Sequence, residues 1–137
     1  MGELNEAYLS IGTNLGDKEE NLTRCLTYLK EADILVEKVS SIFYSKPLGF
    51  KSEHDFLNLC IRIKTELSPL LLLDLIKRIE LDMGRTRPSL NGVYQDRIID
   101  IDIIFFNNLS LQDERLILPH PYWNLRPFVY FPLLELV

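Results

Sequence analysis

The sequence predicts an α+β fold in which one antiparallel sheet carries its helices on one face. Four stretches rich in β-branched and aromatic residues are interleaved with two of helical period, in the order strand, helix, strand, strand, helix, strand. The first, third and fourth strands each have one side of pure hydrocarbon and one side that includes polar groups, which suits a sheet covered by helices on one face. This order is the βαββαβ arrangement of a ferredoxin-like sheet. We expect the polar sides to align into an open, functional face.

The first strand is expected over residues 7–12, with alternating apolar and polar side chains. The glycine-bounded connection at residues 12–16 lacks the Lys-Ser/Thr pair of a phosphate-binding P-loop, so we interpret it as a turn. Asp17 with Glu20 is a plausible cap for a first helix that ends near Glu31.

One continuous second strand is expected over residues 34–44, where Val, Ile, Phe and Tyr are frequent. Residues 45–55 form a long polar loop of the kind that often carries binding groups, and we interpret His54 within it as a solvated residue. Residues 56–66 alternate cleanly and predict the third strand, with Asn58 and Arg62 on its polar side.

The second helix has the clearest signals in the chain. Ser68 is expected to cap it and Pro69 to occupy its first helical position, and the helical pattern continues to Gly84. Its apolar residues at helical spacing are Leu72, Leu73, Ile76, Ile79 and Met83. In the apolar tail, residues 116–121 are expected to form an extra strand and turn, and a short final helix begins near Arg126.

The fourth strand, residues 97–106, carries two acids in an otherwise apolar run. Alternation places Asp100 and Asp102 on one face, about 7 Å apart at the backbone. The opposite face is expected to hold Ile99, Ile101, Ile103 and Phe105. Two desolvated carboxylates require a partner or a metal, and Mg²⁺ takes one or two carboxylates together with substrate phosphates. The alternative is a solvent-facing edge strand with two ordinary acids.

Basic residues gather in sequence beside these acids. Lys77, Arg85, Arg87 and Arg97 occur close to Glu80, Asp100 and Asp102. Arginines on a flexible loop can close over a transferring phosphoryl group and neutralise its charge. The alternative is a solvated charged loop. His120, between two prolines, either donates to a phosphate oxygen or is structural, and the residues leave this open.

Composition limits the protein classes. The chain has 137 residues and 47% hydrophobic content, which predicts one globular domain over residues 1–137. A net charge of −5 argues against non-specific nucleic-acid binding. Cys25 and Cys60 fall within apolar segments and are expected to be buried thiols. With neither a leader nor an apolar run of spanning length, we expect a cytoplasmic protein with no membrane association.

Several motifs in one order carry a family resemblance. They are residues 10–16, 47–49, 56–58, 79–80 with 84–87, and, most specifically, 97–103, 119–121 and 126–128. Together they cover nearly the whole chain, and the sequence resembles the 6-hydroxymethyl-7,8-dihydropterin pyrophosphokinase family of folate biosynthesis. The resemblance implies transfer of a pyrophosphoryl group from ATP to the pterin hydroxymethyl group, with release of AMP.

The resemblance also implies a division of the site. Asp100 and Asp102 would hold two Mg²⁺ ions, and Arg85, Arg87 and Arg97 would be catalytic. The implied nucleotide contacts are Lys77, Glu80, Arg87, Arg97, His120 and Arg126. The implied pterin contacts are Ser45, Pro47, Leu48, Phe56, Asn58, Tyr94 and Phe128. The expected partners are therefore ATP and the pterin, and the expected state is a monomer. Tyr94 stands where many members have tryptophan, and Lys77 where some have glutamine.

Two other classes fit a ferredoxin-like sheet with paired acids. A regulatory module would bind a small ligand without chemistry. A metal-dependent nuclease would use Asp100 and Asp102 to cleave nucleic acid. Neither of these two classes releases AMP from ATP.

Overall fold

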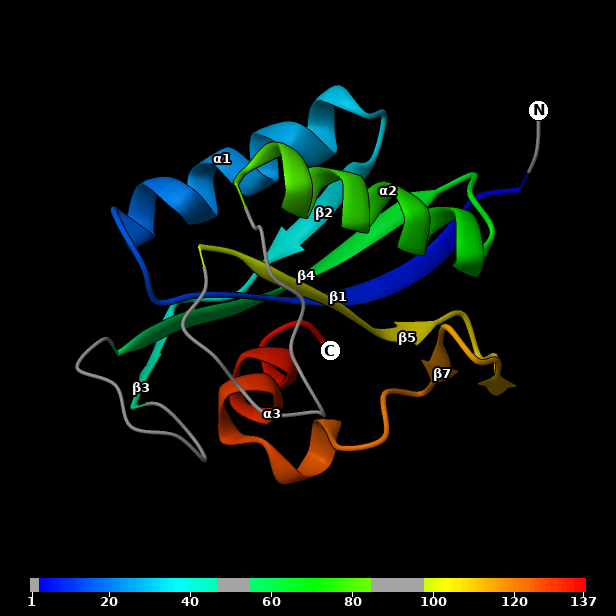
Figure 1. Ribbon diagram of the computed structural model, residues 1–137. Helices are drawn as coiled ribbons and strands as arrows, with labels where there is room; N and C mark the ends of the chain where they lie inside the picture. The colour runs from blue at the N-terminus through cyan, green and yellow to red at the C-terminus, as the bar shows by residue number, and fades with distance from the viewer. Residues whose placement is uncertain (1–2, 47–54, 85–97) are drawn as a thin grey trace.

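The computed structural model describes residues 3–46, 55–84 and 98–137 (Figure 1). The main sheet contains the strands β1 (Asn5–Thr13), β2 (Leu35–Val39), β3 (Phe43–Ser45), β4 (Phe56–Thr65) and β5 (Asp100–Phe106). The other elements are α1 (Lys18–Glu31), α2 (Pro69–Asp82), β6 (Leu111–Gln112), β7 (Ile117–Leu118), the 3-10 helix η1 (Trp123–Leu125) and α3 (Pro127–Leu134). The strand order is β2-β4-β1-β5, with β3 also paired to β4, and every pair is antiparallel. The predicted ferredoxin-like fold with a C-terminal strand and short helix is confirmed.

The two long helices cover one face of the sheet (Figure 1). Asp17 caps α1 as predicted, because its carboxylate accepts from the backbone N of Glu20 at 3.1 Å. Pro69 begins α2 as predicted, but the Ser68 hydroxyl makes no cap hydrogen bond. Only the carbonyl of Ser68 is used, at 2.9 Å from the Leu72 nitrogen. The helix stops at Asp82, before the predicted end.

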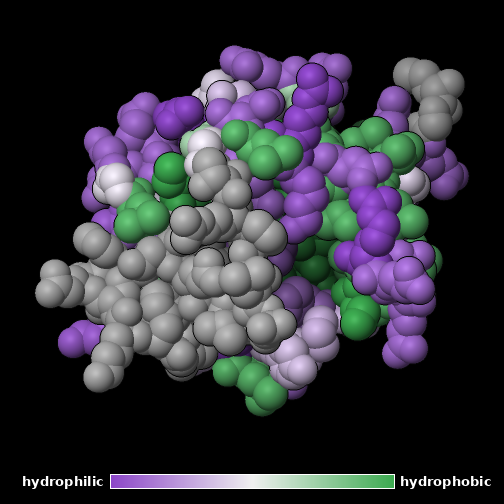
Figure 2. Space-filling view, in the orientation of Figure 1, coloured by the Kyte–Doolittle hydropathy of each residue, from purple (hydrophilic) through white to green (hydrophobic). Residues whose placement is uncertain are grey.

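The core between sheet and helices confirms the predicted alternation. The sheet contributes the buried residues Ala7, Leu9, Ile11, Leu57, Leu59, Ile61, Ile63, Ile99, Ile101 and Ile103. The helices contribute Leu22, Cys25, Leu29, Leu72, Leu73, Ile76 and Ile79. The outer surface of the helices, which faces away from the sheet, is largely hydrophilic in the view of Figure 2. In the described ranges, no helix is long and apolar enough to span a bilayer.

The prediction of one continuous second strand was wrong. Val39 pairs with Ile61 and Phe43 pairs with Asn58, so four steps on one strand (39 to 43) oppose three on β4 (61 to 58). Ser40 lies at this irregularity. Its hydroxyl accepts from the Cys60 nitrogen at 2.9 Å, and its own N–H donates to the Cys60 carbonyl at 2.9 Å. The Ser40 hydroxyl thus takes the place of a backbone carbonyl as the acceptor for the Cys60 N–H, and the predicted strand is divided into β2 and β3.

The predicted position of Phe105 was also wrong. Tyr8 pairs with Phe105 and Leu9 with Ile103, so Ile104 is an extra residue in β5 and forms a bulge. The bulge reverses the alternation. Phe105 packs edge-to-face on Tyr8, with ring centroids 5.9 Å apart, and Phe106 enters the helix-facing core.

The second face of the sheet is partly covered, although we expected it to be open. Figure 1 shows α3 on the side of the sheet opposite α1 and α2. A second apolar cluster joins sheet and C-terminal segment, and consists of Cys60, Ile104, Val129, Leu133 and Leu136. Arg62 fixes the chain end by donating to the Leu136 carbonyl at 3.0 Å. Asn58, Asp100 and Asp102 project to this same face, in register with Gly12 and Ser10 of β1.

Candidate active site

One row of residues on the second face joins three strands. Gly12 of β1 pairs with Asn58 of β4 on one side and with Asp100 of β5 on the other. Ser10 lies in the same way between Cys60 and Asp102. Directly opposed residues in antiparallel strands project to the same face. Because neighbouring strands are about 4.8 Å apart, the backbones of Asn58 and Asp100 are separated by about 10 Å.

The acidic pair lies in a concentration of negative charge. The pKa of Asp102 is raised to about 7, first by burial and then by the charges of Asp100 and Glu80. Arg126 and Lys77 oppose this rise and reduce it in part. Among the described residues, the two acids thus have a larger effect on the pKa of Asp102 than the two cations, which is an environment that favours a further cation.

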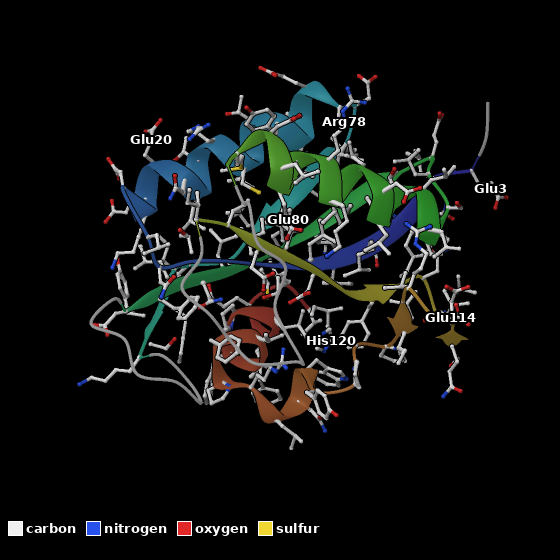
Figure 3. All side chains as sticks on the ribbon, in the orientation of Figure 1. Glu3, Glu20, Arg78, Glu80, Glu114 and His120 are labelled. Carbon is white, nitrogen blue, oxygen red and sulfur yellow. The ribbon has the colours of Figure 1, made fainter. Side chains whose placement is uncertain are left out.

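Glu80 connects α2 to the acidic strand. The residue is 3% exposed, and its Oε2 accepts from the Ile101 nitrogen at 2.8 Å. Lys77 Nζ lies 3.6 Å from the other carboxylate oxygen. In Figure 3 the Glu80 side chain extends from α2 toward β5. Because Ile101 lies between the two aspartates, this hydrogen bond fixes the backbone that carries both of them.

His120 is held beside the same strand. Its backbone N–H donates to the Ile104 carbonyl at 3.0 Å, and the N–H of Tyr122 donates to its Nδ1 at 3.3 Å. Since Nδ1 is an acceptor, the neutral ring carries its proton on Nε2. Burial, followed by the charge of Arg126, lowers the pKa of His120 to about 4. At neutral pH the side chain, labelled in Figure 3, is thus an uncharged hydrogen-bond donor.

A pocket of about 280 Å³ lies between α2, β5 and the C-terminal segment. Three residues of the predicted site line it, namely Lys77, Asp102 and His120. The sequence analysis assigned none of the other lining residues to the site; these are Leu73, Ile101, Ile103, Asp113, Glu114, Arg115, Leu116, Ile117 and Pro121. Arg115 forms an ion pair with Asp74 of α2. In the sequence it is one of two arginines in the tail, and only folding brings that part of the tail against α2.

Three of the predicted pterin residues, Ser45, Phe56 and Asn58, lie near one another at the other end of the row. Ser45 pairs with Phe56, and Asn58 follows two residues later on β4. The Oδ1 atom of Asn58 is buried and has no hydrogen-bond partner among the described residues. Phe128 packs against the second apolar cluster. Phe43, which the sequence analysis missed, pairs with Asn58 in register.

Part of the predicted site cannot be placed. Arg85, Arg87, Arg97, Pro47, Leu48 and Tyr94 lie outside the described residues, as does His54. Arg126 can be placed: it precedes α3, and its guanidinium lies 5.5 Å from the ring centroid of Tyr122.

The donor set of the acidic pair fits magnesium. No cluster of three or more His, Cys, Asp or Glu side chains suited to a metal occurs in the described ranges. Mg²⁺ does not require such a cage, because it binds one or two carboxylates and completes its octahedron with water and substrate phosphates. Asp100 and Asp102 match this pattern.

Comparisons with known proteins agree with this geometry. A family model described as 7,8-dihydro-6-hydroxymethylpterin-pyrophosphokinase (HPPK) matches residues 8–137. A 2-amino-4-hydroxy-6-hydroxymethyldihydropteridine pyrophosphokinase of Bacillus subtilis is 41% identical over 133 residues, which are 96% of this chain and 78% of that protein. A protein of the same name from Porphyromonas gingivalis is 40% identical over 127 residues, covering 92% and 86% of the two chains.

Other similar proteins are much longer. The bifunctional protein FolKE of Lactococcus lactis subsp. cremoris is 43% identical over 131 residues, which are 95% of this chain and 37% of that protein. A crystal structure of HPPK-DHPS in complex with substrates has a TM-score of 0.68 and 18% identity, and the match covers 95% of this chain and 39% of that one. At this identity the structural likeness supports the fold alone.

Proposed function

Because the chain belongs to the 7,8-dihydro-6-hydroxymethylpterin-pyrophosphokinase family, we propose that it transfers the pyrophosphoryl group of ATP to 6-hydroxymethyl-7,8-dihydropterin, a step of folate biosynthesis. The pterin hydroxymethyl oxygen forms a bond to the β-phosphorus. The bond between that phosphorus and the α,β-bridging oxygen breaks, AMP leaves with this oxygen, and the hydroxyl proton is released. The observation that carries the proposal is the row in which Gly12 separates Asn58 from Asp100.

The pterin is proposed to bind at the Asn58 end of the row. A carboxamide offers both a donor and an acceptor, which match the amide edge of a pterin. The buried and unpartnered Oδ1 of Asn58 supports this role, because a ligand donor would satisfy it. Phe56 and Phe128 are proposed to pack on the flat ring, and Ser45 pairs with Phe56.

The nucleotide is proposed to occupy the pocket beside α2. Leu73, Leu116 and Ile117 would provide apolar surface for the nucleoside. Lys77 and Arg115, which share the pocket with the acids Asp113 and Glu114, would provide positive charge for the phosphates. The neutral imidazole of His120 would donate from Nε2 to a phosphate oxygen, and Arg126 would add a further positive charge. Arg85, Arg87 and Arg97 are proposed to close over the transferring group. Glu80 lies on the same helix as Lys77, with its carboxylate against the backbone of β5.

Asp100 and Asp102 are proposed to hold two Mg²⁺ ions at the junction of the two substrates. When bound, Mg²⁺ supplies a Lewis acid that polarises phosphate oxygens and lowers the pKa of a coordinated hydroxyl. The raised pKa of Asp102 supports this assignment, because it results from burial and from the negative charges of Asp100 and Glu80, which a bound cation would offset.

Product analysis tests the reaction. The protein is incubated with ATP, Mg²⁺ and the hydroxymethyl pterin, and AMP is resolved from ADP by chromatography. AMP formed in equal amount to pterin diphosphate is expected. ADP would identify transfer of a single phosphoryl group and reject the proposal, and binding without either product would indicate a regulatory module. Cleavage of an added oligonucleotide would indicate the nuclease alternative.

We also propose that the chain acts as a single domain, as a monomer and in the cytoplasm. The sheet and the two apolar clusters form one continuous structure through the described ranges, which supports one domain. Both cysteines are buried thiols, which suits a reducing compartment. Light scattering at working concentration tests the monomeric state, and a mass near twice 16.0 kDa would reject it.

A further inference from the structure

Glu80 is more deeply buried than a nucleotide contact needs to be. It is 3% exposed, and it is not among the residues that line the pocket between α2 and the C-terminal segment. Lys77, one turn earlier on α2, does line that pocket and is exposed. Within the described residues, the carboxylate is instead directed at the backbone of β5 (Figure 3).

The position of its hydrogen bond on β5 is informative. β5 is at the end of the strand order and pairs with β1 on one side. An edge strand leaves every second N–H without a ladder partner. The N–H of Ile101 donates to Glu80 Oε2 at 2.8 Å, and the Ile101 side chain is fully buried. A buried N–H without an acceptor would be costly, so this carboxylate has a backbone role.

The residues on each side of Ile101 are the two aspartates. Their side chains project to the face opposite that of Ile101, and their direction therefore depends on how the peptide planes at 100–102 are held. β1 holds one edge of these planes through the pairs of Asp100 with Gly12 and Asp102 with Ser10. Glu80 holds the other edge from α2. The acidic strand is thus fixed from both sides at the point where the carboxylates must converge.

We propose that Glu80 is a positioning residue, whose acceptor oxygen holds the Ile101 N–H and so sets the spacing and direction of Asp100 and Asp102. This replaces the nucleotide contact expected for Glu80, and it rests on the proposed function only for its consequence on catalysis. The required property is a hydrogen-bond acceptor of glutamate length. Negative charge is not required.

A pair of nearly isosteric variants separates the acceptor from the charge. Glu80→Gln keeps an oxygen at the same reach, whereas Glu80→Met fills a similar volume without an acceptor. Asp82→Asn, at the exposed end of α2, is the control for removal of a negative charge from this helix. Backbone amide exchange of Ile101 is measured by NMR in the substrate-free protein, with the Ile11 amide of β1 as the reference for an intact sheet.

We expect Glu80→Met to lower the protection of the Ile101 amide by at least about tenfold and to leave Ile11 within about threefold. Glu80→Gln and Asp82→Asn should leave the protection of both amides within about threefold of the wild-type values. In steady-state kinetics Glu80→Met should lower kcat by at least about tenfold with less than about threefold change in KM for ATP, and Glu80→Gln should retain kcat within about threefold.

Two results would overturn the proposal. One is normal Ile101 protection in Glu80→Met. The other is a Glu80→Gln variant that keeps this protection but loses kcat tenfold or raises KM for ATP, because charge or nucleotide contact would then be the requirement. If Glu80→Met does not fold, the Gln variant still tests whether charge is required, and loss of its kcat or of its affinity for ATP would overturn the proposal. If the wild-type protein makes no AMP, the proposed function fails, while the exchange comparison still tests the backbone role.

Discussion

Gly12 and Asn58 lie directly opposite each other on β1 and β4, and a methyl group added to Gly12 would stand 2.5 Å from Nδ2 of Asn58. Glycine is needed at this position for close approach and not for a left-handed backbone, because its φ is not positive. The absence of a side chain at position 12 thus determines where the Asn58 carboxamide lies, and Asp100 is the neighbour on the other side.

Gly12→Ala is therefore expected to weaken pterin binding by at least about tenfold and to leave ATP binding nearly unchanged, since the amide must move away from its ligand. Calorimetry with the pterin and a non-hydrolysable ATP analogue measures both affinities. Gly16→Ala is the matched control: Gly16 has φ +72, so alanine is strained there, but no close contact meets its Cβ. Equal loss of pterin affinity in both variants would show that general destabilisation is responsible.

Asp102→Asn is expected to lower kcat by at least about 10²-fold without unfolding the protein, because the side chain serves the site and is not part of the helix-facing core. Thermal unfolding gives a second readout. Mg²⁺ with an ATP analogue should raise the Tm of the wild-type protein and not that of the variant. Asp33→Asn, on an exposed turn with φ 63 that asparagine tolerates, should behave as wild type. Equal magnesium-dependent stabilisation of Asp102→Asn would contradict the metal role.

The lowered pKa of His120 predicts an acid-sensitive stability. Its ordinary pKa is 6.5 and its pKa in the fold is about 4, so between these values the unfolded chain takes up a proton that the folded chain does not. This contribution is fully present above pH 6.5 and is lost as the pH falls toward 4, by at most about 3 kcal/mol. Urea unfolding at pH 7.5 and pH 4.5 should show a smaller loss for His120→Gln than for the wild type. His54→Gln, which removes the other histidine, is the control, and it should lose nearly as much stability between pH 7.5 and pH 4.5 as the wild type.

Arg115→Ala is expected to raise KM for ATP by about tenfold, with a smaller effect on KM for the pterin, because Arg115 lines the proposed nucleotide pocket and the pterin residues lie elsewhere. Steady-state kinetics with each substrate varied in turn measures this difference. Arg78→Ala removes an exposed arginine from α2 outside the pocket and should leave both KM values within about twofold. A larger change in KM for the pterin than in KM for ATP would reject the nucleotide assignment of this pocket.

The sequence predicted the features of the fold that depend on local periodicity. The alternation of β1, β4 and β5 correctly identified the helix-facing core, and the Asp17 and Pro69 signals identified the helix starts. Where alternation failed, an extra residue entered a strand. Neither the Ser40 irregularity nor the bulge at Ile104 has a local signature, because each depends on which residue of another strand lies opposite.

Some features of the candidate site likewise follow from local spacing, and others require the tertiary structure. The spacing of Asp100 and Asp102 places both carboxylates on one face of an extended chain, whatever surrounds them. The row that joins them to Asn58 through Gly12 requires the order of β4, β1 and β5 in the sheet. The Arg115 contribution and the cover of the second face require the C-terminal segment to dock on elements far away in the chain.

The amino-acid sequence by itself thus determined the order and faces of the elements and the pairing of the two aspartates, because a side-chain period acts between neighbours along the backbone. Only the tertiary structure decided that Glu80 would bind the Ile101 amide, that Asn58 would lie against Gly12, and that His120 would be neutral. These properties arise from burial and from contacts between residues that are distant in sequence, and they exist only once the sheet, α2 and the C-terminal segment have assembled.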